Sequence, residues 1–173
     1  PVFVFVIIFS AISSNETDGL DGLNGGVLLF AFTSFAVISF FQNKMDLAAF
    51  SAAVAGAILA FLWFNIYPAR FFMGDTGAIS LGTTLGVIAM LTNSALILFI
   101  IVFIYVIESG SVAIQLFSKK FLKRKVFLAA PLHHHFEAKG RPEPKITMRA
   151  SVFTAVTAII GVIVGILGMG KFK

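Results

Sequence analysis

The chain has 173 residues, of which 58% are hydrophobic and 12% charged, with a formal net charge of +5 and no cysteine. This composition, with a mean hydropathy of +0.99, excludes an ordinary soluble domain and indicates an integral membrane protein. The lack of cysteine excludes disulfides, thiolate metal sites and a cysteine nucleophile. In a membrane protein a positive net charge first reflects loop asymmetry and anionic lipid, so we expect no nucleic-acid partner.

The apolar stretches predict an all-α fold. The first, Val2–Ile12, is shorter than the roughly 20 residues needed to cross a bilayer. We interpret it as a truncated N-terminal helix whose upstream part lies outside this sequence; a re-entrant or interfacial piece is the alternative. Since backbone groups in lipid must be paired within their own segment, each longer stretch should be a helix. About five complete transmembrane helices are expected in a single domain, residues 1–173, at Leu23–Phe41, Leu47–Phe64, Ala78–Leu91, Ala95–Phe117 and Thr147–Met169.

Passing these helices alternately through the membrane divides the basic residues unequally. Lys44, Lys171 and Lys173 fall on one side, and the other ten of the thirteen Lys and Arg fall on the other. The richer side is predicted to be cytoplasmic. The basic run Lys119–Lys125 on that side is expected at headgroup level, in contact with anionic membrane lipids. The connections carrying the unusual acidic and histidine residues fall on the same side.

The first of these connections is Asn15–Leu23, with the sequence NETDGLDGL. Asp18 and Asp21 are three residues apart and each precedes a glycine, which predicts a tight turn with two carboxylates. Such oxygens suit Mg²⁺ or hydrogen bonds to a sugar or base. An ordinary capped turn, in which Asp and Gly are common, is the alternative.

A second connection ends in Phe71–Gly77, where Asp75 is expected to open a helix. A helix N-terminus attracts anions, and Asp75 could hold a metal that bridges to a phosphate there. Asp75 could instead be a simple N-cap. That role would not explain its position on the same side as Asp18 and Asp21.

Two further features involve ionisable residues. His133, His134 and His135 are consecutive in a basic loop, so their side chains point in different directions and cannot share one metal from a helix. They could contact phosphate or carry a proton, or belong to an exposed polar loop. Glu108 lies within an apolar stretch, where a carboxylate needs a partner. A functional role and a helix-packing role both remain open for it.

Taken together, the motifs resemble one family. NETDGLDGL at Asn15–Leu23, NIYPARFFMGDTG at Asn65–Gly77 and PLHHHFE at Pro131–Glu137 occur in the order found in phospho-N-acetylmuramoyl-pentapeptide transferases. These enzymes belong to the polyprenyl-phosphate N-acetylhexosamine-1-phosphate transferase superfamily. The resemblance covers nearly the whole chain. The unbroken HHHFE favours this family over the related N-acetylglucosamine-phosphate transferases.

The resemblance implies a reaction of peptidoglycan synthesis at the cytoplasmic face of the bacterial inner membrane. Phospho-N-acetylmuramoyl-pentapeptide would pass from UDP-MurNAc-pentapeptide to undecaprenyl phosphate, giving lipid I and UMP, with Mg²⁺ as cofactor. By resemblance, Asp75 would be the metal ligand, Asp18 would lie in the catalytic cluster, and Asn15 would contact substrate beside it. The histidines, His133, His134 and His135, would contact phosphate or shape the sugar-phosphate side. The nucleoside pocket would comprise Asp21, Asn65, Phe72 and Gly74.

Two departures from the family pattern affect these expectations. Glu16 occupies a position that is usually apolar, which adds a charge beside the site. The family also has further helices upstream, with an adjacent Asp–Asp pair that this sequence lacks. We therefore expect the 173 residues alone to be inactive.

Other interpretations remain open at the level of sequence. A related UDP-N-acetylglucosamine:polyprenyl-phosphate transferase is the nearest alternative, and a non-catalytic scaffold descended from the transferase is another. A cation transporter is the alternative from a different class, although transport predicts ionisable groups near mid-membrane rather than at one surface. A homodimer is a possible assembly, but no residue pattern determines it.

Overall fold

The computed structural model describes residues 1–169, and every regular element in that range is helical. This confirms the all-α class predicted from the sequence. The helices are α1 Val2–Thr17, α2 Leu23–Phe41, α3 Met45–Asn65, α4 Gly74–Leu91, α5 Ala95–Ile101, α6 Phe103–Phe117, α7 Leu132–Ala138 and α8 Glu143–Gly168, with a π-helical turn at Ser118–Leu122 after α6.

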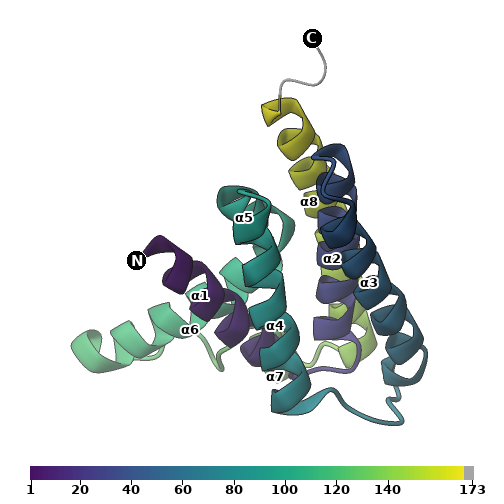
Figure 1. Cartoon of the computed structure of the whole chain (residues 1–173). Helices are drawn as coiled ribbons and strands as arrows, with labels where there is room; N and C mark the ends of the chain where they lie inside the picture. The colour runs from purple at the N-terminus through teal and green to yellow at the C-terminus, as the bar shows by residue number, and fades with distance from the viewer. Residues whose placement is uncertain (170–173) are drawn as a thin grey trace.

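Helix α2 is the centre of the bundle. It packs between α3 and α8 and also contacts α1, α4 and α5 (Figure 1). Two-thirds of its residues are buried, against about a third or fewer in α3, α4 and α8. The side chains of Leu28, Phe32 and Phe35 are fully enclosed. Because its surroundings are protein on nearly all sides, the apolar run of α2 forms the core of the molecule.

The outer helices present apolar side chains to their surroundings, as lipid-facing helices do. Leu59 and Trp63 on α3 and Ile159 on α8 are among the many large hydrophobic residues more than half exposed. Four helices (α2, α3, α4 and α8) are long and apolar enough to cross a membrane, and α5 with α6 makes a fifth if the bent pair is one span. The protein is therefore a polytopic membrane protein.

The loops that connect these helices lie at two opposite ends of the bundle. We call one of these the site end; it carries the connections 18–22, 66–73 and 123–142, whose contacts are described below. At the opposite end the Gln42 side chain donates to the Thr92 carbonyl at 2.8 Å, and the Lys44 ammonium donates to the Leu91 carbonyl at 2.6 Å. Lys171 and Lys173, which the sequence also assigns to this opposite side, lie outside the described residues.

One predicted helix is wrong as a continuous element. The stretch Ala95–Phe117 breaks at Val102, and α6 with the turn after it lies at 85° to α5. Helix α5 packs against α8, whereas α6 crosses α1 and points away from the bundle in Figure 1. Tyr105 and Ser109 on α6 bond to polar side chains of α2 and α1. These partners hold α6 across the bundle, so tertiary contacts account for a bend at which the sequence has neither proline nor glycine.

Other helix boundaries differ from the predicted ones by a few residues. Helix α1 continues five residues beyond Ile12, to Thr17. The short stretch Ala78–Leu91 gains its extra turn at the N-terminal side only, from Gly74. Helix α8 begins at Glu143, with Pro144 in its first turn, where proline's missing N–H costs nothing.

Two glycines let α1 and α4 approach closely. A Cβ built on Gly82 would lie 2.5 Å from the Ser10 carbonyl oxygen, and one on Gly86 would lie 2.9 Å from the Ile7 Cα. These neighbours are backbone atoms, so they cannot turn aside as a side chain could. Small residues four apart on one helix are a common way to bring membrane helices into contact.

We predict that Gly82→Ala destabilises the folded protein by about 1–3 kcal/mol, because the added methyl group must push α1 away from α4. Thermal unfolding of the full-length protein in detergent micelles measures this. Gly56→Ala on α3 is the control, since nothing lies within 4 Å of its Cβ position; it should stabilise α3 slightly, by about 0.5–1 kcal/mol. Equal effects of the two changes would contradict the close α1–α4 contact.

Candidate active site

The turn between α1 and α2 is bonded to two segments that are distant in the sequence. The Asp21 carboxylate accepts a hydrogen bond from the Ala69 backbone N–H at 2.9 Å. The Asp21 backbone N–H donates to the Glu143 carboxylate at 2.6 Å, at the first residue of α8. Asp21 therefore connects the turn to both the α3–α4 connection and the start of α8.

Asn65, predicted to contact substrate, forms a second connection in the same place. Its side-chain oxygen accepts from the Gly22 N–H at 3.1 Å, and its side-chain nitrogen donates to the Phe71 carbonyl at 3.1 Å. The residue is buried. In this structure the Asn65 amide thus positions the α1–α2 turn against the loop that carries Phe72 and leads into α4 at Gly74.

Asp18 lies beside the N-terminus of α4. Burial raises the pKa of the Asp18 carboxyl above its ordinary value, and the negative charge of Asp75 adds to the rise. Hydrogen bonds from the Gly74 backbone and the Asn24 side chain act in the opposite direction. The two carboxylates predicted from separate motifs, Asp18 and Asp75, are therefore close enough to repel each other.

Asn24 is a site residue that the sequence interpretation missed. It is fully buried, and its side-chain oxygen accepts from Tyr105 at 2.6 Å and from Ser14 at 3.2 Å. Its side-chain nitrogen lies 3.5 Å from the Met73 sulfur. With its bond to Asp18, Asn24 joins α1, α2, α6 and the α4 N-terminus. An amide directly after the acidic motif, at the start of an otherwise apolar helix, was the available signal.

His133 is held in the interior by Glu108. A single Glu108 oxygen, Oε2, accepts from the His133 backbone N–H at 3.2 Å and lies 3.1 Å from the ring Nδ1. The histidine is 1% exposed. Because Nδ1 lies against this carboxylate, the other ring nitrogen, Nε2, is turned away from Glu108. Glu108 thus has a definite partner in the structure, which the sequence did not identify.

The Nε2 atom of His133 faces Gly19, next to Asp18. It is buried without a hydrogen-bond partner among the described residues. It also lies where a side chain at position 19 would begin, so only glycine fits there. This contact brings the histidine segment to the acidic turn, although more than a hundred residues separate them in the sequence.

The other two histidines are placed differently. The His134 ring pairs with Glu137 at 2.6 Å and is nearly half exposed. The His135 Nδ1 accepts from the Leu128 backbone N–H at 3.1 Å, which holds the preceding loop. Of the three predicted catalytic histidines, only His133 points into the bundle toward the acidic turn.

The remaining predicted residues line the outer part of the site. Asp75 and Phe72 are exposed, the latter by 72%. Gly74 adopts a positive φ of 67°, which favours glycine, at the start of α4. Asn15, in the last turn of α1, has a buried side-chain oxygen without a partner among the described residues.

Glu16, whose charge departs from the family pattern, has a clear structural role. Its carboxylate accepts from the Ser109 hydroxyl at 2.6 Å, and the same Ser109 oxygen lies 2.7 Å from the Ser13 hydroxyl. The Glu16 carboxylate therefore links α1 to α6 through a hydrogen bond, and its partner lies on α6 rather than at the turn that carries Asp18.

We predict that Asp18→Asn raises the unfolding temperature of the metal-free protein at neutral pH by about 1–3 °C. The folded-state pKa of Asp18 is raised, so the protonated carboxyl favours folding and the ionised one opposes it. Below the unfolded-state pKa, Asp18 is protonated in both states and does not lower the free energy of unfolding. As the pH rises through the raised folded-state pKa, the buried carboxyl ionises, and the free energy of unfolding falls. The stabilisation should therefore shrink on acidification, which thermal unfolding at several pH values in EDTA measures. A difference that grows toward acid pH would contradict this assignment.

We also predict that Glu108→Ala destabilises the protein by about 2–5 kcal/mol, because it leaves the buried His133 backbone N–H without an acceptor and the ring Nδ1 without its partner. Glu108→Gln should cost less, since its amide oxygen can still accept. Glu137→Ala is the matched control; it removes the partner of the half-exposed His134 and should cost about 0–1 kcal/mol. Denaturant or thermal unfolding compares the three variants. Similar losses from Glu108→Ala and Glu137→Ala would contradict the buried role of Glu108.

Within residues 1–169, no three His, Asp or Glu side chains gather closely enough to form a metal cage. Asp18 and Asp75 nonetheless fit a divalent cation held partly by substrate phosphates, because Mg²⁺ usually takes only one or two protein carboxylates in such sites. Neither carboxylate has an ion-pair partner in the described part of the chain. The donor set therefore suits a shared, substrate-assisted site rather than a closed one.

The first half of the chain matches a known protein family. Residues 1–93 match the model of the family described as glycosyl transferase family 4. The matched segment runs from α1 to just beyond the end of α4. It includes Asp18, Asp21, Asn65 and Asp75, whereas Glu108 and the three histidines lie beyond it.

Proposed function

The chain belongs to glycosyl transferase family 4, and on that premise we propose that it is part of the enzyme that transfers phospho-N-acetylmuramoyl-pentapeptide from UDP to undecaprenyl phosphate. Family membership supports the coarser activity, which is transfer of a phosphosugar to polyprenyl phosphate. The finer assignment is to the formation of lipid I at the cytoplasmic face of the bacterial membrane.

The observation that carries the proposal is the contact between His133 and the acidic turn. The PLHHHFE segment favours the muramoyl enzyme on sequence, and its first histidine lies against Gly19 beside Asp18. The segment that distinguishes the donor sugar is therefore part of the same site as the acidic residues of the family match.

The arrangement suits a reaction between a lipid and a water-soluble nucleotide. In the net reaction, a bond forms between an oxygen of the lipid phosphate and the β-phosphorus of the UDP-sugar, the bond between the α- and β-phosphates breaks, and UMP leaves with the electron pair. This balance is the same for direct attack and for a route through a covalent enzyme intermediate. A bound Mg²⁺ would neutralise the diphosphate and stabilise charge on the departing UMP. Since the site residues lie at one end of the bundle, both substrates can reach them at the membrane surface.

Each side chain then has a role that its position allows. Asp75, exposed in the first turn of α4, would hold the metal, with Asp18 beside it. Phe72 offers an exposed ring on which uracil can stack. Asn15 has an unpaired buried oxygen for a substrate donor. His133, held at Nδ1 by Glu108, would fix the histidine segment against Gly19 and so shape the sugar-phosphate side of the site.

Asp21, Asn65 and Gly74 would shape the nucleoside pocket through the backbone connections they hold. His134 and His135 would line the sugar-phosphate side from the histidine segment. Peptidoglycan precursors, undecaprenyl phosphate and surrounding membrane lipids are the partners that this function requires.

The decisive test is UMP release from UDP-MurNAc-pentapeptide by the full-length protein that contains this chain, with undecaprenyl phosphate and Mg²⁺. We expect Mg²⁺-dependent release that falls about 100-fold or more in Asp75→Asn, because metal stabilisation of the transition state contributes several kcal/mol. Asp46→Asn is the matched control, since this carboxylate lies in the first turn of α3, at the opposite end.

Replacement of the donor by UDP-N-acetylglucosamine tests the finer assignment. Release with that donor alone would assign the protein to the related N-acetylglucosamine-phosphate transferases. Equal activity of Asp75→Asn and the parent protein would contradict the metal role of Asp75.

A further inference from the structure

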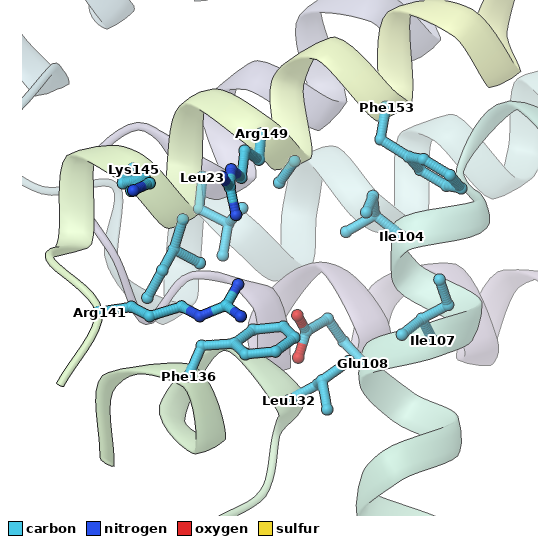
Figure 2. A pocket seen from close by; sticks show the side chains of 12 residues that line it. Leu23, Ile104, Ile107, Glu108, Leu132, Phe136, Arg141, Lys145, Arg149 and Phe153 are labelled. Carbon is cyan, nitrogen blue, oxygen red and sulfur yellow. The ribbon is translucent and has the colours of Figure 1, made fainter. Parts of the chain in front are cut away.

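A cavity of about 310 Å³ lies between α6, α7 and α8, and none of the aspartates or nucleoside-pocket residues proposed above lines it (Figure 2). Its walls are mostly apolar, with Ile104 and Ile107 from α6 and Phe153 from α8. Three basic residues, Arg141, Lys145 and Arg149, also line it. Figure 2 shows Lys145 and Arg149 on α8, and Arg141 extending from the connection before α8, beside the Phe136 ring, toward Glu108.

The positive charge of this cavity is not neutralised by the protein. No carboxylate in the described part of the chain lies within ion-pair distance of Arg141, Lys145 or Arg149. Glu108 also lines the cavity, but one of its oxygens is already used by His133. The cavity therefore has three basic side chains and one carboxylate, and that carboxylate already pairs with His133. The excess positive charge suits an anionic ligand.

The depth of the cations in the membrane indicates what kind of anion. Arg149 is the last charged residue of α8, and no charged residue follows it up to Gly168. The uncharged segment after Arg149 is close to the roughly 20 residues that cross the hydrocarbon core. Lys145 and Arg149 are four residues apart, on one face of the helix. This face lies where the phosphates of a bilayer lie.

The apolar half of the cavity continues toward the membrane interior. Phe153, one turn beyond Arg149, also lines a neighbouring hollow with Phe99 and Phe103. The Phe103 and Phe153 rings are 6.0 Å apart. A phosphate bound at the cations would thus have a continuous apolar surface for its hydrocarbon chains.

The cavity is separate from the acidic site. The buried His133 ring lies between Glu108, which lines the cavity, and Gly19, which follows Asp18 in the acidic turn. Neither Asp18 nor Asp75 lines the cavity. A phosphate held there would be turned away from the reacting groups, so its ligand is a resident of the membrane rather than the lipid that reacts.

We propose that the α6–α7–α8 cavity is a binding site for an anionic phospholipid, with the headgroup phosphate at Arg141, Lys145 and Arg149 and an acyl chain against Ile104, Ile107 and Phe153. The site adds a fixed lipid to the protein and does not depend on the function proposed above. It also places a lipid phosphate beside Glu108, the residue that positions His133.

The experiment is native mass spectrometry of the full-length protein in detergent micelles, titrated with dioleoyl phosphatidylglycerol. We expect one tightly bound lipid in the parent protein, and roughly tenfold weaker binding in the double variant Lys145→Gln/Arg149→Gln, because each basic residue near the surface adds to lipid affinity. Both residues are exposed, so the variant should fold. Arg141 is left unchanged because its guanidinium packs on the Phe136 ring.

A matched control is Lys119→Gln/Lys125→Gln, which removes two exposed basic residues of the headgroup-level run that do not line the cavity. It should weaken only general attraction to the lipid surface and leave the affinity of the one tightly bound lipid unchanged. Ile107→Phe, which fills the apolar half and keeps all three cations, should weaken phosphatidylglycerol binding several-fold with the unfolding temperature unchanged.

Equal weakening in the control pair would show general surface attraction and overturn the proposal, as would unchanged binding in the cavity variant. Displacement of the lipid by millimolar inorganic phosphate would identify a free-anion site instead. Displacement mole for mole by undecaprenyl phosphate, lost in the cavity variant, would identify an acceptor site. Either displacement result would overturn the phospholipid assignment.

Discussion

The backbone of the turn between α1 and α2 is paired mainly by residues that are distant in the sequence, and the organisation of the site end follows from this. Near a membrane, exposed N–H groups without partners are costly. The N–H groups of Asp21 and Gly22 donate to side chains of Glu143 and Asn65, and the Asp21 carboxylate accepts from the next loop. These bonds fix the start of α2, the end of α3 and the start of α8 relative to one another. The carboxylates of the site are carried on that frame.

Polar side chains inside the bundle act in the same way. Asn24 is fully buried, yet its amide bonds to three neighbouring segments. Glu108 is buried, and its carboxylate accepts from the His133 backbone N–H and pairs with the ring Nδ1 of the same histidine. A polar group in apolar surroundings stabilises a structure only when its hydrogen bonds are made, which restricts each to one arrangement. The bend between α5 and α6 follows, because α6 reaches these partners only by crossing α1.

The site and the lipid-facing surface therefore share elements. Helix α6 carries Glu108 toward His133 on one side and Ile104 and Ile107 toward the cavity on another. Arg149 marks the depth at which the charged half of α8 gives way to its apolar half. Transfer of a phosphosugar to polyprenyl phosphate needs water-accessible and lipid-accessible surfaces side by side, and the polar connections and apolar outer helices meet at one end of the bundle.

The sequence by itself determined the fold class and most helices, because long apolar runs in lipid have few alternatives to a helix. The bounds Leu23–Phe41 were predicted to the residue. It also indicated Asp18 and Asp75 as candidates, because glycine-flanked carboxylates at helix ends are conspicuous in an apolar chain. The bend at Val102, the partner of Glu108, the network of Asn24 and the different orientations of the three histidines were decided only by the tertiary structure. Each depends on a contact between segments far apart in the chain, and such contacts cannot be predicted from the local spacing of residues.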